Sequence, residues 1–236
     1  MSATAVLEVD DLQVHYGLAR ALSGVSLRVE RGGALAVLGA NGAGKTTLAR
    51  AISGLVPPRK GQVVVDGDNV TGWAPYRIAR AGVMHVPAER LVLPGLSVLD
   101  NLRTAVRFAC PRAERRAALD RALTIFPRLG ERRDQIAGTL SGGEQQMLSL
   151  ARALAVPPAL LIADELSHGL APIVVEQVFD GLRTARAEGV AMIVVEQFVG
   201  AALGLTDQAV ILRRGEVVWS GASSGAAARL EEHYMH

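Results

Sequence analysis

A glycine-rich segment from Gly39 to Thr46 holds the first residues in this sequence whose types and spacing could do chemistry. Its sequence, GANGAGKT, follows an apolar run and precedes a stretch with helical spacing. Glycines let backbone N–H groups turn inward around a phosphate, and the N-terminus of a following helix adds a favourable field. Lys45 is expected to reach the β- and γ-phosphates, and the Thr46 hydroxyl to ligate Mg²⁺. The pattern predicts nucleotide binding by Gly39, Ala40, Asn41, Gly42, Ala43, Gly44, Lys45, Thr46 and Thr47.

A second candidate segment is the apolar run Leu160–Ala163, which ends in two acids, Asp164 and Glu165. If the run is a strand, Asp164 lies at the carboxyl edge of a sheet, where open α/β folds bind ligands. There Asp164 can hold Mg²⁺ through water, while Glu165 can orient and deprotonate an attacking water. Such a run is by itself typical of a solvated strand end. Together with the phosphate-binding loop it predicts nucleotide hydrolysis, with Glu165 and Lys45 as catalytic residues.

The third segment, residues 140–146, has the sequence LSGGEQQ and opens a helical pattern that continues through Arg152. A serine hydroxyl and flexible backbone donors at a helix start offer a second anion-binding site. One chain has no need of two such sites, because the phosphates already have a cradle at residues 39–46. We therefore expect Ser141, Gly142 and Gly143 to close over a nucleotide that another protomer holds. This predicts a dimer with two nucleotides at its interface.

The bulk composition excludes several other classes of protein. The formal net charge is only +2 and aromatic residues make up 4% of the chain, so we expect no nucleic-acid partner. No apolar run approaches the roughly 20 residues that a membrane helix needs, and the first residues lack the pattern of a signal peptide. We therefore expect no direct insertion into a membrane. The single cysteine, Cys110, is expected to be a small apolar helix residue.

The elements that must position these residues alternate between strands and helices. Strands are expected at Val6–Val9, Leu12–His15, Ser26–Val29, Ala34–Leu38, Gly61–Asp66, Leu160–Ala163 and Ala191–Val195, with a final hairpin of Ala209–Leu212 and Glu216–Trp219. Helices are expected from Gly44 to Gly54, from Ile173 to Ala187 and from Phe198 onwards, and a helical insertion between Pro94 and Leu140. This order implies a mainly parallel α/β core with an antiparallel portion at its start.

With these motifs in this order, the sequence resembles the nucleotide-binding domain of ABC transporters over nearly its whole length. The resemblance implies an α/β fold: a P-loop NTPase core of ABC type with an antiparallel β subdomain and an inserted α-helical subdomain. It implies one domain over residues 1–236, divided into the β subdomain and P-loop core (1–87), the helical subdomain (88–150) and the remaining core with its C-terminal hairpin (151–236). Within the superfamily the sequence is most similar to ATPase subunits of branched-chain amino-acid importers. Supporting segments are Phe126–Leu129, Glu131–Arg133, Ala137–Thr139, Gly169–Pro172 and Val195–Gln197.

The resemblance also implies a function, cofactors and partners. The chain would bind and hydrolyse ATP with Mg²⁺ and power the import of branched-chain or other hydrophobic amino acids. It would act at the cytoplasmic face of the cell membrane, with transmembrane permease subunits and a second ATPase subunit in a homo- or heterodimer. Alternatives are the ATPase of another transporter, such as a urea or amide importer or an exporter, and a weakly active ATP-binding partner subunit. A cassette acting in DNA repair or on ribosomes is a further rival, but such proteins usually carry a coiled-coil insertion or two cassettes.

The resemblance assigns roles to further residues and marks departures from the family pattern. Tyr16 matches the aromatic residue that stacks on adenine, and Gln197 stands at a switch position where most members have histidine and can bond to the γ-phosphate. Ala88 replaces a glutamine or glutamate in the loop that enters the helical insertion. Glu89 beside it either takes over as a Mg²⁺ ligand or is a solvated surface charge paired with Arg90.

Overall fold

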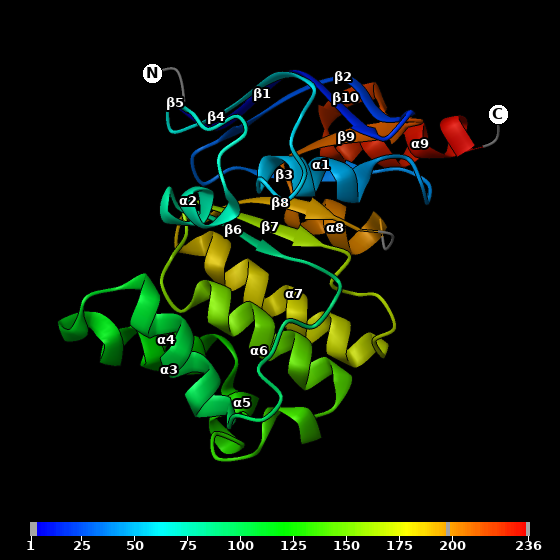
Figure 1. Cartoon of the computed structure of the whole chain (residues 1–236). Coiled ribbons are helices and arrows are strands. Elements are labelled where there is room, and N and C mark those ends of the chain that lie inside the picture. Colours follow the sequence, from blue (N-terminus) through cyan, green and yellow to red (C-terminus); the bar gives the residue numbers. More distant parts are fainter. Residues whose placement is uncertain (1–3, 197–198, 235–236) are drawn as a thin grey trace.

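The computed structural model describes residues 4–196 and 199–234, in which two sheets lie above a layer of helices (Figure 1). The N-terminal sheet is antiparallel, with the strand order β2-β1-β4-β5. Its strands are β1 (Ala5–Tyr16), β2 (Ala19–Glu30), β4 (Lys60–Val65) and β5 (Asp68–Asn69). The sequence predicted two short strands where β1 is a single one. The pairing register shifts between Val9 and Leu12, and Asp11 adopts a φ of 44°, so the chain bulges and then continues as a strand.

The second sheet has the strand order β10-β9-β3-β8-β7-β6. Its strands are β3 (Ala34–Leu38), β6 (Val83–Val86), β7 (Leu160–Asp164), β8 (Ala191–Val195), β9 (Gln208–Arg213) and β10 (Glu216–Ala222). Neighbouring strands are parallel from β6 to β9, and β10 pairs antiparallel with β9. Every residue of β3, β7 and β8 is buried, as continuous apolar runs predict for strands covered on both faces. Strand β6 was not among the strands that the sequence predicted.

Helices cover the second sheet, and most of them lie below it in Figure 1. They are α1 (Lys45–Ile52), α2 (Pro75–Arg80), α3 (Val98–Ala109), α4 (Arg115–Ile125), α5 (Pro127–Glu131), α6 (Gly142–Leu154), α7 (Pro172–Ala187), α8 (Val199–Leu205) and α9 (Ser223–Tyr234). The predicted helical insertion consists of α3 to α5, with short 3-10 turns at Arg112–Glu114 and Ala137–Thr139, and packs against α6. The structure confirms the predicted fold class, and α2 and α9 are additions to the predicted elements.

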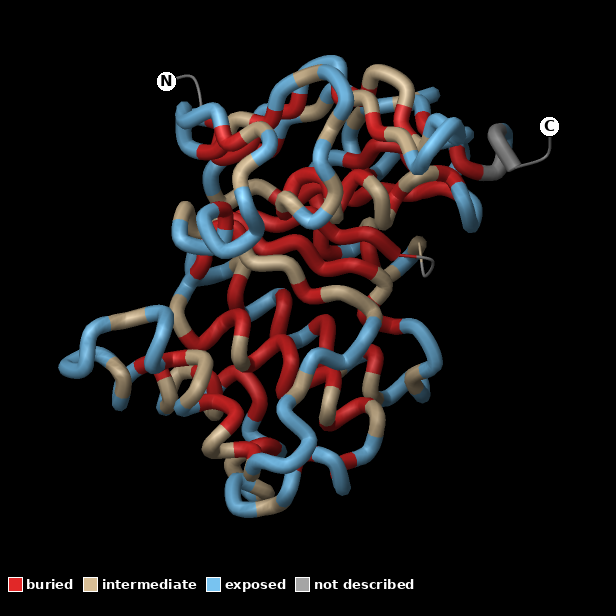
Figure 2. The backbone as a smooth tube through the Cα atoms, in the orientation of Figure 1, coloured by how far each residue is buried: buried red, intermediate tan, exposed pale blue. Residues whose placement is uncertain are grey.

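The second sheet separates two hydrophobic cores, which Figure 2 shows as buried strands between buried stretches of chain above and below. Alternate residues of β3 show this division. Ala34, Ala36 and Leu38 pack into the lower core with α6 and α7, whereas Leu35 and Val37 pack into the upper core with α1 and the antiparallel sheet. Because both faces are packed, the carboxyl edge of the sheet is the position left for chemistry.

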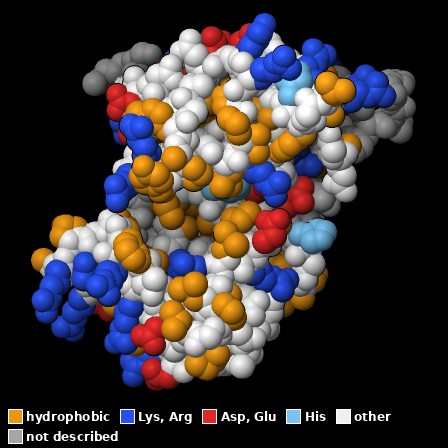
Figure 3. Space-filling model, in the orientation of Figure 1, with side chains coloured by type: hydrophobic (Ala, Val, Ile, Leu, Met, Phe, Trp, Pro, Cys, Tyr) orange, Lys and Arg blue, Asp and Glu red, His pale blue; other side chains and the backbone are white. Residues whose placement is uncertain are grey.

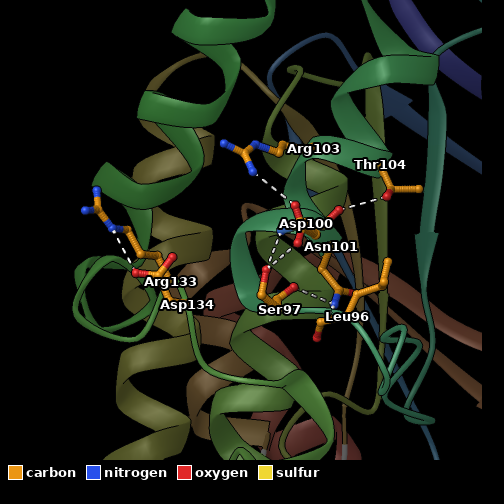
Figure 4. Close-up of polar contacts among 8 residues, drawn as sticks. All are labelled: Leu96, Ser97, Asp100, Asn101, Arg103, Thr104, Arg133 and Asp134. Atoms are coloured by element: carbon orange, nitrogen blue, oxygen red, sulfur yellow. Dashed lines mark hydrogen bonds and ion pairs between the residues drawn. The ribbon is translucent and has the colours of Figure 1, made fainter.

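The segment that joins β6 to the helical insertion is fixed at its far end by the first turn of α3 (Figure 4). Asn101 is fully buried, and its side chain exchanges two hydrogen bonds with the backbone of Leu93, at 2.8 and 3.0 Å. Ser97 caps the helix by accepting a hydrogen bond from the backbone N–H of Asp100. Hydrogen bonds from Ser97 and Arg103 lower the pKa of the Asp100 carboxyl. The side of the segment next to the helices is therefore rigidly attached.

Across residues 4–196 and 199–234, none of the helices combines the length and the apolar character that a membrane span requires.

Candidate functional site

The glycine-rich loop lies between β3 and α1, where the sequence predicted it. Gly39 has a φ of 149°, and a Cβ there would lie 2.3 Å from the backbone oxygen of Leu212. Gly44 precedes the first residue of α1 with a φ of 107°, and a Cβ there would lie 2.8 Å from Leu22. Side chains are therefore excluded at both ends of the loop. A tightly packed glycine-rich loop that leads into a helix start is the arrangement that binds phosphate.

Lys45 is buried at the start of α1, with 3% of its surface exposed. Its ammonium group donates hydrogen bonds to the backbone oxygens of Gly39 at 2.9 Å and Ala40 at 3.2 Å. It also lies 3.6 Å from Oε1 of Glu165. The lysine is thus held over the loop by the loop's own carbonyls, and the predicted base lies beside it.

Glu165 follows β7 in a left-handed conformation with a φ of 53°, which is uncommon for a residue with a side chain. Its backbone N–H donates to the oxygen of Val195 at the end of β8, at 2.8 Å, and that bond holds the turn in place. A non-glycine residue in this region costs of order 1–3 kcal/mol and persists only where the surroundings impose it. The turn directs the carboxylate of Glu165 toward Lys45 instead of along the strand.

Asp164, the last residue of β7, is 2% exposed, and the Thr46 hydroxyl donates to its Oδ1 at 3.3 Å. Thr46 belongs to α1 and Asp164 to β7, so the fold brings the two predicted Mg²⁺ ligands together from positions 118 residues apart. A hydroxyl and a carboxylate are the hard oxygen donors that Mg²⁺ prefers. The pair therefore fits the ion that the sequence implied.

An open cavity of about 380 Å³ lies over this cluster. Lining residues are Arg20, Ala21, Asn41, Gly42, Gly44, Lys45, Thr46, Thr47, Glu165 and Arg214. Arg20 and Arg214 add positive charge that the sequence analysis missed, because they come from β2 and from the turn before β10. Tyr16 does not line this cavity; it is 47% exposed at the end of β1, and Tyr16 pairs with Ala19 one residue before Arg20.

The signature segment begins α6. Ser141 is exposed and precedes the first residue of the helix, and its hydroxyl donates to Oε2 of Glu144 at 2.7 Å while it accepts from the backbone N–H of Glu144 at 3.3 Å. Arg132 lies 2.8 Å from the other oxygen of that carboxylate. Burial alone would raise the pKa of Glu144, but the bonds from Ser141 and the charge of Arg132 bring it below its ordinary value. The serine is thus held at the helix start by an ionised glutamate.

The two glycines of the signature are close to different neighbours. A Cβ on Gly142 would lie 2.2 Å from a guanidinium nitrogen of Arg90, so this arginine covers the helix start. A Cβ on Gly143 would lie 2.3 Å from Val174 of α7. Neither glycine lines the cavity at Lys45, and Ser141 does not line it either. Within the part of the chain that is described, the two predicted phosphate sites are separate.

The remaining predicted residues are placed as follows. Glu89 is exposed and lies 3.6 Å from Arg50 of α1 instead of pairing with Arg90, and it does not line the cavity at Lys45. Ala88 is half-buried in the segment between β6 and α3. Gln197 lies outside the described residues.

A larger groove, of about 740 Å³, separates α2 and β6 from α3 and α6. Figure 3 shows this face of the molecule hollowed between its upper and lower parts, with hydrophobic side chains along the hollow. Tyr76, Met84, Phe108 and Val156 supply apolar surface, and Phe108 is 85% exposed. Arg152 also lines the groove and bonds to the backbone oxygen of Leu91. The groove therefore adjoins the segment that connects the two parts.

Comparisons with known proteins agree with this geometry. The sequence profile described as ABC transporter matches residues 22–168. The chain is 38% identical to the high-affinity branched-chain amino acid transport ATP-binding protein BraG of Pseudomonas aeruginosa, over 98% of this chain and 99% of that protein. It superimposes on the solved ATP-binding subunit of an ABC transporter with a TM-score of 0.85 and 28% identity, over 98% of each chain. A dimeric bacterial ABC transporter cassette shares the fold, with a TM-score of 0.80 and 24% identity over 93% of this chain and 99% of that one. The chain belongs to the ABC transporter family.

Proposed function

We propose that this chain hydrolyses ATP and that two nucleotides are enclosed between two such subunits. The observation that supports hydrolysis most directly is the convergence of Lys45, Thr46 and Glu165 at one cavity, with Asp164 bonded to Thr46 directly beneath it. Lys45 and the glycine-rich loop would bind the β- and γ-phosphates. Glu165, set beside Lys45 by its left-handed backbone, would orient the attacking water and accept its proton.

Thr46 and Asp164 would hold Mg²⁺ at the phosphates. When bound, this ion neutralises charge that develops as the phosphoryl group is transferred. Tyr16 would stack on adenine and Gln197 would bond to the γ-phosphate, as the family resemblance implies. Arg20 and Arg214 of the cavity wall add positive charge, which favours a polyphosphate ligand over an uncharged one.

The dimer follows from the separation of the two phosphate sites within one chain. Ser141, Gly142 and Gly143 would close over the nucleotide that a second subunit holds at its Lys45. An exposed serine at the start of a helix suits that role. The dimeric cassette of the same fold supports this arrangement. The second subunit is either a copy of this chain or a related ATPase.

We propose branched-chain or other hydrophobic amino acids as the transported substrate. The support is the 38% identity with BraG over almost the whole of both chains. The groove between α2 and α3 would receive a helix of a permease subunit, because it is apolar and has walls from both parts of the molecule. A partner seated there would hold the protein at the cytoplasmic face of the membrane and respond to movement between the two parts.

The test joins the purified protein with its permease pair in lipid vesicles. With ATP and Mg²⁺ on the side of this subunit, we expect phosphate release and accumulation of leucine, isoleucine or valine from the opposite side. Phe108→Asp should abolish uptake but leave the ATP hydrolysis of the free subunit unchanged, because Phe108 lies on the groove rim and away from Lys45. Uptake of urea or an amide, with no uptake of leucine, would instead identify a different importer.

A weakly active partner subunit remains the second candidate, and Ala88 is the observation that favours it. Phosphate release by the purified protein alone separates the two. Phosphate release no faster than that of a Lys45→Ala control, with ATP still bound by the wild type, would support a subunit that binds ATP without hydrolysing it.

A further inference from the structure

His85 lies in β6 beside the catalytic cluster, and the roles assigned above do not use it. Its side chain is 7% exposed. Nδ1 lies 3.0 Å from the hydroxyl of Ser53, directly after α1, and Nε2 lies 3.7 Å from Oδ2 of Asp164. The imidazole therefore stands between the end of α1 and the acid at the end of β7.

Nε2 of His85 is buried and has no hydrogen-bond partner among residues 4–196 and 199–234. At 3.7 Å it is too far from Oδ2 of Asp164 for a hydrogen bond, yet it faces that carboxylate. Leaving a buried polar atom without a partner is costly, so a small movement that closes the gap between Nε2 and Oδ2 is favourable. Nε2 therefore lies next to Asp164 and is not engaged in another hydrogen bond with the described residues.

The surroundings place a proton on Nε2. If Ser53 donates to Nδ1, the neutral ring carries its proton on Nε2. The Ser53 hydroxyl also lies 2.9 Å from the backbone oxygen of Ala49, and if it donates there, Nδ1 must donate to the hydroxyl. A neutral ring would then turn a lone pair toward the carboxylate of Asp164, which is repulsive, so the arrangement in which Ser53 donates to Nδ1 is the favoured one. The favoured tautomer has an N–H that faces Asp164.

The carboxylate of Asp164 consequently has two different neighbours. Oδ1 faces the Thr46 hydroxyl, the partner in the proposed Mg²⁺ site, and Oδ2 faces His85. We propose that His85 is a positioning residue for that site: its Nε2–H holds Oδ2, which fixes the rotamer of Asp164 and leaves Oδ1 for the ion. Ser53 supports the ring from behind. The inference rests on the proposed function, in which Asp164 holds Mg²⁺.

The test measures metal affinity without hydrolysis. Mn²⁺ replaces Mg²⁺, and its free concentration is followed by electron paramagnetic resonance in the presence of ADP and the full chain. The two variants are His85→Gln, whose amide N–H reaches the position of Nε2, and His85→Asn, whose shorter amide reaches only that of Nδ1. We expect His85→Gln to stay within about threefold of the wild type, and His85→Asn to bind Mn²⁺ about ten- to a hundredfold more weakly, the usual effect of losing a residue that orients a metal ligand.

Controls separate this inference from the function on which it rests. Binding of a fluorescent ADP analogue in EDTA should be equal in the wild type and both variants, because the glycine-rich loop needs no metal to bind phosphate. His168→Gln, in an exposed loop, should leave Mn²⁺ affinity unchanged. If the wild type fails to bind nucleotide, the proposed function is wrong. If nucleotide binds and His85→Asn holds Mn²⁺ as tightly as the wild type, only the role of His85 is wrong. Should His85→Asn melt early, Ser53→Ala is the second variant, with about a tenfold loss of Mn²⁺ affinity expected and an affinity within about threefold of the wild type contradicting the proposal.

Discussion

The phosphate-binding half of the proposed site lies within the core, whereas the signature half lies at the surface. Lys45 and Asp164 are only 3% and 2% exposed. Lys45 belongs to α1, which packs in the upper core, and Asp164 to β7, a strand buried between the two cores. Ser141 is exposed at the start of α6, and its hydroxyl is already bonded to Glu144. The first half has its lysine, acid and base assembled in one chain. The second half offers an exposed serine at a helix start, with Arg90 of the same chain close to Gly142.

This difference suggests that the two halves have different roles in ATP hydrolysis. A buried, preorganised cluster stabilises charge strongly at the moment of reaction, because its groups need little reorganisation. An exposed helix start can meet and leave a partner without disturbing the core. The phosphate-binding half would therefore determine how fast ATP is hydrolysed. The signature half would determine when hydrolysis can begin. The predictions below test that division.

The largest expected effect is on the phosphate-binding half. Glu165→Gln should lower ATP hydrolysis at least about a hundredfold, the scale of losing a general base. ATP binding should survive, because the loop carbonyls and not Glu165 make the hydrogen bonds to Lys45. Phosphate release measures hydrolysis, and an equilibrium titration measures ATP binding. Light scattering of the variant should show dimers that ATP stabilises. Glu176→Gln, an exposed acid on α7, is the control. Near-normal turnover in Glu165→Gln would place the base elsewhere.

Mixed dimers test the division itself. Lys45→Ala and Ser141→Arg should each be inactive alone. Half of the dimers in an equal mixture combine the two, and each of these holds one intact pair of halves, so about a quarter of the wild-type sites return. Differently tagged protomers and pull-down establish that mixed dimers form. A mixture as inactive as either variant, with mixed dimers present, would show that the halves are not shared between protomers.

The segment between the halves should respond more weakly. Glu89 pairs with Arg50 at the surface, and exposed ion pairs contribute at most about 1 kcal/mol, so Glu89→Ala should change Mg²⁺-dependent turnover less than about fivefold. Ala88→Gln should raise turnover, because it restores a side chain that can bond to the attacking water. Steady-state hydrolysis across Mg²⁺ concentrations measures both. A large loss in Glu89→Ala with weaker dependence on Mg²⁺ would show that Glu89 is a metal ligand after all.

The smallest effect concerns the signature half and depends on pH. The lowered pKa of Glu144 means that its ionised form is favoured in the folded state. That stabilisation is complete above the ordinary pKa of 4.5 and is lost as pH falls through the lowered folded value. Glu144→Gln should be less stable than the wild type by at most about 1 kcal/mol at pH 7, and the gap should close in acid. Melting temperatures of both proteins at stepped pH measure it. A gap that is constant with pH would show that the charge of Glu144 is not involved.

Local patterns in the sequence predicted much of this molecule. Strand β3, the glycine-rich loop and α1 lie where the residues indicated, because each carries its own signal over a few neighbouring positions. The start of α6 was predicted for the same reason. Strand β7 and the two acids at its end were also identified, since a continuous apolar run followed by charge is a local pattern.

What the sequence did not reveal depends on pairing between distant segments. Strand β6 has four residues and an interior histidine, so it lacks a clear strand signal, yet it pairs in parallel with β7 and thereby brings His85 to Asp164. Arg90 reaches Gly142 only because the segment after β6 is tied to the helical insertion. Arg20 and Arg214 reach the cavity through turns of other strands. No local sequence pattern predicts these contacts between distant segments.

The contact between Gly143 and Val174 affects how variants of this protein should be interpreted. Substitutions at Gly143 that abolish transport could be interpreted as evidence that Gly143 contacts the nucleotide. Any side chain there meets α7 of its own subunit, so such variants would first separate two helices. Double substitutions that pair Gly143→Ala with Val174→Gly can distinguish the two causes: recovered transport would indicate a packing defect, and continued failure would indicate a true ligand contact.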